Sequence, residues 1–492
     1  MSGPNVRVCS TQRVLWTIAV SIFGSLVYII WFGMNSDHDN VHPLITQIIP
    51  AGHCTCHSAA SFHCSECLAC VNSTAASNQP SEWKFQYGRD DRNLGLNQNQ
   101  CQTSFPGLFQ DILRSGTYWK ARGGVSAEDL DDTPLENGMA KAMIYNGELY
   151  IIATRAQGGD NRRKIVATLS SISRALSASP DRTTIPNIEF ILSVEDRIDD
   201  VNGVGHPIWT FSRKISEESA WLMPDFGFWA WGHWSNNIGP FGQAIDRVKT
   251  TETGLAFSDK ERKLVWRGKL SFAPKLRRTL LDAARNKPWG DVKELVWNRK
   301  TNFLTMEDHC RYMFIAHVEG TYVFRSTLIL HLPAVCLLNM GANMNIPGRS
   351  YSGSLKYRQA CRSVVVAHQL QYIQHYHYLL VSSGPHQNYV EVNRNFSDLS
   401  ETMDSLLNDP DTAERIANNS VSTFRERYLT LAADACYWRA LWNGWAAVSA
   451  NVTSALESRI DESGFEAGLR YESFMLLDSR DMLQFSFKDY EI

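Results

Sequence analysis

The chain has 492 residues, which is long enough for two or three domains that each bury a core, so we expect more than one domain. Its 48 Lys and Arg residues nearly balance its 51 Asp and Glu residues, and the formal net charge is −3. Such a chain has no broad basic field for nucleic acid, so any anionic ligand must be held by a local group of positive side chains.

An uncharged segment near the N-terminus, residues 14–34, has the length and composition of a membrane-spanning helix. Arg7 and Arg13 precede it, so the positive-inside rule places residues 1–13 in the cytoplasm and the rest of the chain in a lumen. A cleaved signal peptide is the alternative, but the apolar run is longer than a usual signal core and lacks an obvious small-residue cleavage site. We therefore expect a signal anchor and a single-pass type II membrane protein.

Two further features agree with a lumenal body. Ten of the eleven cysteines follow the apolar segment, where an oxidising compartment lets disulfides persist. Asn-X-Ser/Thr sequons, the acceptor sites for N-glycosylation, occur at Asn72, Asn395, Asn418 and Asn451. We therefore expect a disulfide-bonded glycoprotein.

A cysteine-rich stem is expected at residues 35–100. Five cysteines cluster within residues 52–70, and four of them have a spacing that would suit a zinc site. Disulfides are the favoured interpretation, because the lumen oxidises thiols and nothing else in the sequence indicates metal chemistry. Five clustered cysteines leave one to pair elsewhere, and we expect its partner to be Cys101 or Cys436.

A first α/β domain is expected at residues 101–255. The predicted elements are an amphipathic helix in residues 105–115, two strands in 139–155, a helix in 164–180 and a buried parallel strand in 187–196. The two strands meet at Asn146-Gly147, a strong hairpin signal.

A second α/β domain is expected at residues 256–430, followed by a C-terminal helical region at 431–492. The predicted elements are strands at 263–268, 293–298, 363–368 and 379–383, a helix at 275–285 and two helices within 398–429, the second with Pro410 in its first turn. Strands that alternate with helices predict parallel sheets with crossover connections, one on each side of about residue 255.

Two strand ends carry residues suited to chemistry, because ligands of open parallel sheets bind beyond the carboxyl ends of the strands. Asp196 ends one predicted strand and is a candidate general base, with a helix cap or a solvated acid as the alternative. Arg267 ends another and is followed by Gly268; a guanidinium there can clamp phosphate oxygens, and a surface arginine is the alternative.

The stretch WLMPDFGFWAWGHW, residues 221–234, holds six aromatic side chains. They are expected to divide between the hydrophobic core and a stacking platform for a sugar, whose hydroxyls would seek carboxylates. Asp225, Trp229 and Trp231 are the candidates on the acceptor side.

Taken together, the motifs and their order resemble the CAP10-like glycosyltransferases, glycosyltransferase family 90, which include lumenal protein O-glucosyltransferases and fungal capsule-associated proteins. The matching stretches cover most of residues 100–445. They include NIEFILSVED, WLMPDFGFWAW, KLVWRG, MEDHCRYMF with HVEG, SYSGSLKY, ACRSVVVAH, LVSSGPHQNYVEV, NFSDLS and ACYW.

The resemblance implies a GT-B fold, with two Rossmann-like domains behind the transmembrane helix and the stem. It implies a nucleotide-sugar donor bound mainly by the second domain and transfer with inversion at the sugar. We expect no metal or other cofactor, because inverting transfer needs a base on the acceptor side and positive charge or oriented dipoles at the leaving diphosphate. Asp196 matches the acid that activates the acceptor hydroxyl, and Arg267 matches the arginine that binds the donor diphosphate. The remaining donor-side residues implied are Gly268, Gly320, Ser350, Ser352, Lys356 and Tyr357.

The resemblance also implies a disulfide between Cys310 and Cys361 and a bond from Cys436 back to the N-terminal region. One position departs from the family pattern. A basic residue that many members carry in the donor segment is Ser354 here, which weakens the case for tight diphosphate binding.

Residues 321–348 interrupt this pattern, because in the family the stretch equivalent to HVEG runs almost directly into RSYSGSLKY. The genetic code permits splice-donor, branch-point and acceptor bases at matching positions, and removal keeps the reading frame. We interpret the segment as the translation of a retained intron, with a real loop insertion as the alternative. A second membrane span is disfavoured because the Leu-rich part is short and contains His331 and Pro333.

The sequence therefore predicts a type II membrane glycosyltransferase of the Golgi or endoplasmic reticulum that uses UDP-xylose or UDP-glucose and a glycan or protein hydroxyl as acceptor. A non-catalytic, sugar-binding or scaffolding relative with the same fold is the alternative, supported by Ser354 and by the interrupting segment. A zinc-dependent interaction module in the stem is a second alternative.

Overall fold

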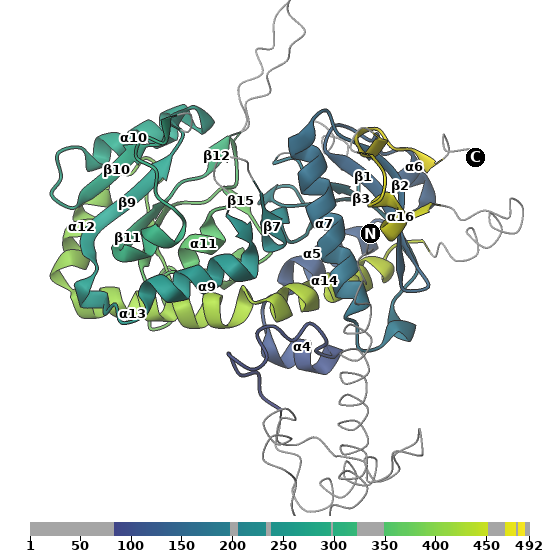
Figure 1. The fold of residues 1–492 in the computed structure, drawn as a ribbon, viewed down its shortest axis with the longest axis horizontal. Helices are drawn as coiled ribbons and strands as arrows, with labels where there is room; N and C mark the ends of the chain where they lie inside the picture. Colours follow the sequence, from purple (N-terminus) through teal and green to yellow (C-terminus); the bar gives the residue numbers. More distant parts are fainter. Residues whose placement is uncertain are drawn as a thin grey trace, which may run out of the picture. The chain divides into compact units, whose positions relative to one another are not determined.

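The computed structural model describes residues 83–196, 205–232, 238–296, 299–321, 349–450, 468–478 and 481–487 (Figure 1). From Lys84 onward these residues belong to one compact unit. The predicted membrane anchor at 14–34 and the cysteine cluster at 52–70 lie outside the described residues. Among the residues that are described, no helix is both long enough and apolar enough to cross a membrane.

The first sheet has six strands in the order β17-β2-β1-β3-β4-β6. They are β1 (Met139–Tyr145), β2 (Glu148–Arg155), β3 (Ile188–Ser193), β4 (Ile208–Thr210), β6 (Trp221–Leu222) and β17 (Leu469–Arg470). The predicted hairpin is confirmed: β1 and β2 are antiparallel, and the φ angles of Asn146 and Gly147, 50° and 73°, fit a type I′ turn. β3 is parallel to β4 but antiparallel to β1, so the sheet is mixed and the prediction of a parallel sheet was wrong here. The reason is the hairpin, since so short a turn joins only antiparallel strands.

Helices α5 (Gln110–Lys120), α7 (Gly159–Ser177) and α14 (Leu431–Ala446) pack against this sheet (Figure 1). α5 begins later than predicted, and Gly107, with a positive φ of 84°, lies in the turn before it. In the core, the ring of Trp209 stacks on Phe190 at 4.1 Å between centroids and meets Trp445 of α14 edge-on at 5.6 Å. The region after residue 430 is therefore not a separate helical region: it completes the first core and also supplies strand β17.

The second sheet has five parallel strands in the order β10-β9-β11-β14-β16. They are β9 (Glu261–Gly268), β10 (Gly290–Glu294), β11 (Tyr312–His317), β14 (Val364–His368) and β16 (Val390–Val392). The prediction of a parallel sheet after about residue 255 is confirmed. The strand order reverses between β9 and β11, which is a topological switch point of the kind where open α/β sheets bind ligands.

One predicted strand is absent, and another is shifted. Residues 379–383 form no strand, because the side-chain amide of Asn388 hydrogen-bonds to backbone groups that a neighbouring strand would need. It accepts from Val381 N at 2.9 Å and donates to Leu379 O at 2.8 Å. β10 ends at Glu294, near the start of the strand predicted for residues 293–298.

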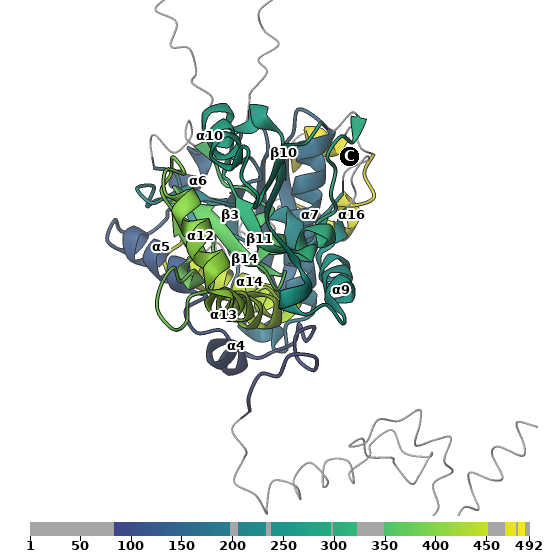
Figure 2. The ribbon, with the colours of Figure 1, turned by 90° about the vertical axis from the view of Figure 1, so that its left-hand side faces the viewer.

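Helices cover both faces of the second sheet (Figures 1 and 2). Helices α10 (Pro274–Ala284), α12 (Leu399–Asn408) and α13 (Pro410–Ser420) bury apolar side chains on one face. Helix α9 (Phe241–Glu252) and the 3-10 helix η6 (Glu307–Arg311) cover the other. The predicted pair of helices after residue 398 is confirmed, and Pro410 is the first residue of the second.

Two disulfides lie within the described residues. Cys310–Cys361 joins η6 to the chain two residues after α11 (Leu355–Gln359), as the resemblance implied. Cys101–Cys436 joins α4 (Gln98–Ser104) to α14, which confirms the bond from Cys436 to the N-terminal region. Because these two cysteines are bonded to each other, the expectation that one of them pairs with a stem cysteine was wrong.

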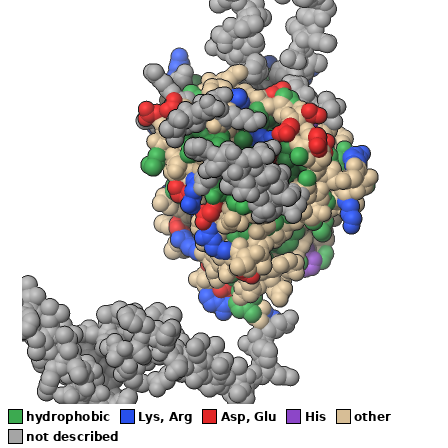
Figure 3. All heavy atoms as spheres, turned by 90° about the vertical axis from the view of Figure 1, so that its right-hand side faces the viewer, with side chains coloured by type: hydrophobic (Ala, Val, Ile, Leu, Met, Phe, Trp, Pro, Cys, Tyr) green, Lys and Arg blue, Asp and Glu red, His purple; other side chains and the backbone are tan. Residues whose placement is uncertain are grey.

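Acidic and basic side chains lie interspersed on the face drawn in Figure 3, in keeping with the small net charge.

Candidate functional site

The carboxyl end of β3 lies against the segment that follows β11. The hydroxyl of Ser350 donates to the backbone oxygen of Asp196, so two residues 154 positions apart are in direct contact. The Asp196 carboxylate pairs with the ammonium of Lys164, from α7, at 2.9 Å, and the Asp196 side chain is 33% exposed. The candidate base thus lies in reach of solvent, where the first sheet meets the predicted donor segment.

Aromatic side chains lie beside this carboxylate. The Lys164 ammonium is 5.3 Å from the centre of the Phe226 ring, and that ring meets Trp231 edge-on at 5.3 Å. Trp231 is half-buried and packs so close to Gly353 that a Cβ at Gly353 would be 3.3 Å from the indole. Trp231 therefore lies against the predicted donor segment, and its role on the acceptor side stays a prediction.

Glu195, the neighbour of Asp196, has a different environment. Its carboxylate accepts from the side-chain amides of Asn137 at 2.7 Å and Asn161 at 2.6 Å. Burial raises the pKa of Glu195, against the opposing effect of the hydrogen bond from Asn161 and the charge of Lys164. Adjacent carboxylates thus differ: one pairs with an ammonium, and the other is held by neutral amides.

Asp225 and Lys356, predicted for opposite sides of the site, are bonded to each other. The Lys356 ammonium lies 2.8 and 2.9 Å from the two Asp225 oxygens, and both side chains are buried. Gln374 donates to the same carboxylate at 3.0 Å, and Gly227 N donates at 2.7 Å. The charge of Lys356 is therefore neutralised inside the protein, and the pair fastens α11 to the aromatic stretch.

Arg267 is also bonded to a carboxylate. Its guanidinium donates to Asp291 of the adjacent strand β10 at 2.7 Å, and its side chain is 6% exposed. Burial alone would raise the pKa of Asp291, but hydrogen bonds from Arg267, Lys293 and Tyr312 outweigh it and lower the pKa to about 2. Gly268 has a packing role, because a Cβ there would lie 2.4 Å from the Trp266 indole.

The remaining predicted residues lie around the same junction. Gly320 ends the connection from β11 and pairs with Ser350. Ser352 is bonded to Ser354 at 3.0 Å, and the Tyr357 hydroxyl donates to Gly227 O at 3.1 Å. Trp229 lies apart from them, with the Arg174 guanidinium 4.5 Å from its ring centre.

Residues 322–348 lie outside the described part of the chain, but their flanks are described. Gly320–Thr321 and Arg349–Ser350 form a two-stranded antiparallel ladder, with Gly320 opposite Ser350. The chain therefore leaves and re-enters the fold at one place, next to Asp196.

Two arginines that the sequence analysis did not single out lie at the switch point. Arg277, from α10, donates to the backbone oxygens of Lys269 and Glu319, which follow β9 and β11. Arg358, from α11, lies 3.1 Å from Nδ1 of His317, the last residue of β11. Both side chains are buried, and no local sequence signal separates them from exposed neighbours such as Arg278.

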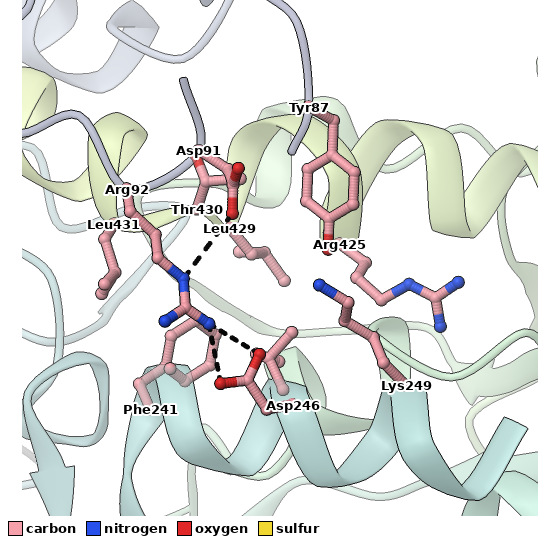
Figure 4. A pocket seen from close by; sticks show the side chains of 12 residues that line it. Tyr87, Asp91, Arg92, Phe241, Asp246, Lys249, Arg425, Leu429, Thr430 and Leu431 are labelled. Atoms are coloured by element: carbon pink, nitrogen blue, oxygen red, sulfur yellow. Dashed lines mark hydrogen bonds and ion pairs between the residues drawn. The ribbon is translucent and has the colours of Figure 1, made fainter. Parts of the chain in front are cut away.

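A separate pocket, drawn in Figure 4, lies between the start of the compact unit, α9 and the start of α14. An ion pair between Arg92 and Asp246, with atoms 2.6 Å apart, crosses it, and Lys249 lies 5.0 Å from the Tyr87 ring centre. It contains none of the predicted site residues. Within the described ranges, no group of three or more His, Cys, Asp or Glu side chains is arranged to hold a metal ion.

This combination of a doubly wound parallel sheet, an adjoining mixed sheet and a partly exposed acid fits a glycosyltransferase fold. The sequence profile of glycosyl transferase family 90 matches residues 97–455, so the chain belongs to that family. No curated protein matches the chain.

Proposed function

We propose that the protein is an inverting glycosyltransferase that moves xylose or glucose from a UDP-sugar to a hydroxyl group of a glycan or protein. The observation that carries the proposal is the contact between Ser350 and Asp196. It places an acid from the end of β3 next to the segment that follows the switch point of the parallel sheet.

The two sheets supply the two sides of a GT-B-like arrangement in this proposal. The parallel sheet binds the nucleotide beyond the carboxyl ends of β9 and β11, where doubly wound sheets take such ligands. The first sheet supplies the acceptor side through Asp196 and Trp231. The proposal assigns four residues near this junction to the donor side: Gly320, Ser350, Ser352 and Tyr357.

In the proposed reaction, the Asp196 carboxylate takes the proton of the acceptor hydroxyl as its oxygen attacks the anomeric carbon of the sugar. The bond from that carbon to the diphosphate oxygen breaks on the opposite side, which inverts the configuration and releases UDP. Lys164 acts as a positioning residue, because its ion pair at 2.9 Å orients the carboxylate. Positive groups must stabilise the charge that develops on the leaving diphosphate.

Arg267 and Lys356 have a supporting role in this proposal, because each already donates to a protein carboxylate. The proposed setting is the lumen of the Golgi or endoplasmic reticulum, with residues 14–34 as the anchor. The expectation that no metal or other cofactor is needed also becomes part of the proposal, and EDTA is expected to leave turnover unchanged.

The test is UDP release from a panel of UDP-sugars by the full-length protein in detergent, with glycan and glycoprotein acceptors. Asp196→Asn is expected to lower turnover by about 10²- to 10⁴-fold, the usual contribution of a general base. Asp411→Asn, in the exposed first turn of α13, is the matched control. Turnover that survives Asp196→Asn would refute the assigned base.

A deletion variant that lacks residues 321–348 tests the inserted segment. Because Gly320 pairs with Ser350, the two ends of the segment lie close enough for a short connection to replace it. Turnover only in the shortened protein would support the retained-intron hypothesis. Equal turnover in both would support a tolerated loop, and UDP binding without turnover in either would favour the non-catalytic alternative.

A further inference from the structure

The buried carboxylates of the protein differ in how their charge is neutralised. Several of those in the described residues form an ion pair with a lysine or an arginine. Examples are Asp111 with Arg213 at 2.8 Å, Glu252 with Lys260 at 2.6 Å and Asp225 with Lys356 at 2.8 Å. These pairs follow the general rule that a charge removed from water needs an opposite charge close by.

Glu195 departs from this rule. It is only partly exposed, and within the described part of the chain no lysine or arginine forms an ion pair with it. Its Oε1 atom accepts from two neutral side-chain amides, those of Asn137 and Asn161, and no described residue donates to Oε2. Burial raises the pKa of Glu195, so the charged form is held at a cost in free energy that a neutral glutamine would avoid.

The chain around Glu195 is shaped to hold this carboxylate. Gly138 has a positive φ of 81°, which favours glycine, and a Cβ added to it would lie 2.8 Å from Cγ of Glu195. Asn137 is itself held in place, because its side-chain oxygen accepts from Gln157 N at 2.7 Å. The surrounding residues therefore leave room for the Glu195 side chain and fix the position of one of its oxygens.

Glu195 and Asp196 lie next to each other against helix α7. The chain bends at both residues after the end of β3. Asn161, which donates to Glu195, precedes Lys164 by three positions on α7, and residues at this spacing share one face of a helix. Lys164 in turn pairs with Asp196. The two carboxylates are therefore neighbours along that face of the helix, and each is held by a different kind of partner.

We propose that the Glu195 carboxylate binds a second hydroxyl group of the acceptor while Asp196 takes the proton of the hydroxyl that reacts. The acceptor is then a sugar, which carries hydroxyl groups on neighbouring carbons, and not a serine or threonine side chain with a single hydroxyl. The inference rests on the proposed function for the reaction. Because Oε1 is fixed by two amides, Oε2 is left to accept from a ligand, and a hydrogen bond from a hydroxyl to a carboxylate is stronger than one to a neutral amide.

This contact would separate transfer to a sugar from hydrolysis of the donor. In hydrolysis, the oxygen of water attacks the anomeric carbon, the bond to the diphosphate oxygen breaks, and Asp196 takes the proton as it does in transfer. Water brings no second hydroxyl to Glu195. Hydrolysis is therefore expected to depend on Asp196 alone, whereas use of a sugar acceptor is expected to depend on both carboxylates.

The experiment measures UDP release from the best UDP-sugar by the full-length protein in detergent, with water alone, with methyl glycosides of hexoses and pentoses, and with a serine peptide. Glu195→Gln is expected to raise KM for the methyl glycoside by about 10- to 100-fold, the range for hydrogen bonds to a charged group. The rate of hydrolysis and KM for the UDP-sugar are expected to stay constant. Glu401→Gln, in the exposed first turn of α12, is the control and is expected to change none of these values.

Thermal unfolding separates a role in binding from a role in folding. The amide oxygen of glutamine can still accept from Asn137 and Asn161, so Glu195→Gln is expected to leave Tm unchanged or raise it. A lower Tm together with equal losses of transfer and hydrolysis would show a structural role and overturn the inference. So would an unchanged KM for the methyl glycoside, or the failure of the unchanged protein to use any methyl glycoside.

The two proposals fail separately in this design. If Asp196→Asn keeps both rates while Glu195→Gln weakens use of the glycoside alone, the assigned base is wrong and the role of Glu195 stands. If both rates depend on Asp196 but Glu195→Gln uses the glycoside normally, the reverse holds. An unchanged protein that releases UDP under none of these conditions would overturn the proposed function and this inference with it.

Discussion

Two buried cationic regions of the second half of the chain differ in one respect. Lys356 is part of a complete ion pair with Asp225, whereas Arg277 and Arg358 lie near each other without a carboxylate. A buried pair satisfies its own charge, but an unpaired buried charge costs free energy until an anion neutralises it. The contacts of a buried basic residue, more than the motif that contains it, therefore show whether it stabilises the fold or is available to bind a ligand.

The same comparison changes the interpretation of Arg267. Its place after a buried strand predicts a phosphate clamp, but Asp291 already accepts its hydrogen bonds and Tyr312 donates to the same carboxylate at 2.9 Å. Displacement of Asp291 would be needed before Arg267 could bind a diphosphate directly.

The largest expected effect comes from breaking the complete pair. Lys356→Met leaves the Asp225 charge buried and uncompensated, so we expect the free energy of unfolding to fall by about 3–5 kcal/mol. Urea unfolding followed by circular dichroism measures the loss. The double variant Lys356→Met with Asp225→Asn removes both charges and is expected to recover most of the stability; equal losses in the two would contradict a charge-based origin.

The pH dependence of stability tests His309, a buried histidine that the charge of Arg267 reaches. Burial, with the nearby charge of Arg358 next in effect, lowers the pKa of His309 to about 4. The unfolded chain therefore takes up this proton near pH 6.5 and the folded protein only near pH 4, so stability is present above pH 6.5 and is lost as pH falls towards 4. The loss from this group is about 3 kcal/mol. We expect His309→Gln to reduce the pH dependence of Tm in this range, and an unchanged dependence would show that His309 is not the group responsible.

Stabilisation of the protein by bound UDP tests the unpaired arginines, Arg277 and Arg358, directly. UDP at about 100 times its Kd is expected to stabilise the protein by about 2.7 kcal/mol, because it binds the folded state only. At the same UDP concentration, Arg277→Gln and Arg358→Gln are expected to show a much smaller rise in Tm, while Arg278→Gln keeps the full rise. Differential scanning fluorimetry at fixed protein concentration measures the rise in Tm. A full rise in the arginine variants would show that Arg277 and Arg358 do not bind UDP.

The smallest effect concerns the partly buried ion pair between Lys164 and Asp196. Lys164→Gln removes the partner that orients Asp196, and we expect kcat to fall by about tenfold while KM for the UDP-sugar stays constant. Lys164→Arg keeps the charge and is expected to restore most of the rate. A change in KM alone would show that Lys164 binds the donor and does not position the base.

Much of the frame was predictable from local pattern. The Asn146-Gly147 hairpin, the parallel sheet after residue 255 and the helix that begins at Pro410 each follow from signals within a few residues. Asp196 was singled out because it follows a compact apolar run; the structure ends β3 at Ser193 and brings Asp196 into contact with Ser350, while its role as a base stays a prediction.

The missed features depend on contacts between distant positions. Asp225 and Lys356 are 131 residues apart, and nothing local shows that one neutralises the other. Arg277 lies beside Arg278 in a charged helix, and only the packing of α10 on Trp266 decides which of the two is buried. The strand predicted at residues 379–383 failed for the same reason, because the amide of Asn388 takes the backbone groups that a strand would use.

The most direct measurement is a crystal structure of the protein with UDP bound. The account predicts that the diphosphate oxygens lie within hydrogen-bond distance of the Arg277 and Arg358 guanidinium groups, with the sugar end directed towards Asp196 and the Lys356–Asp225 pair intact. A diphosphate held by Arg267 and Lys356, with Asp291 and Asp225 displaced from them, would contradict it.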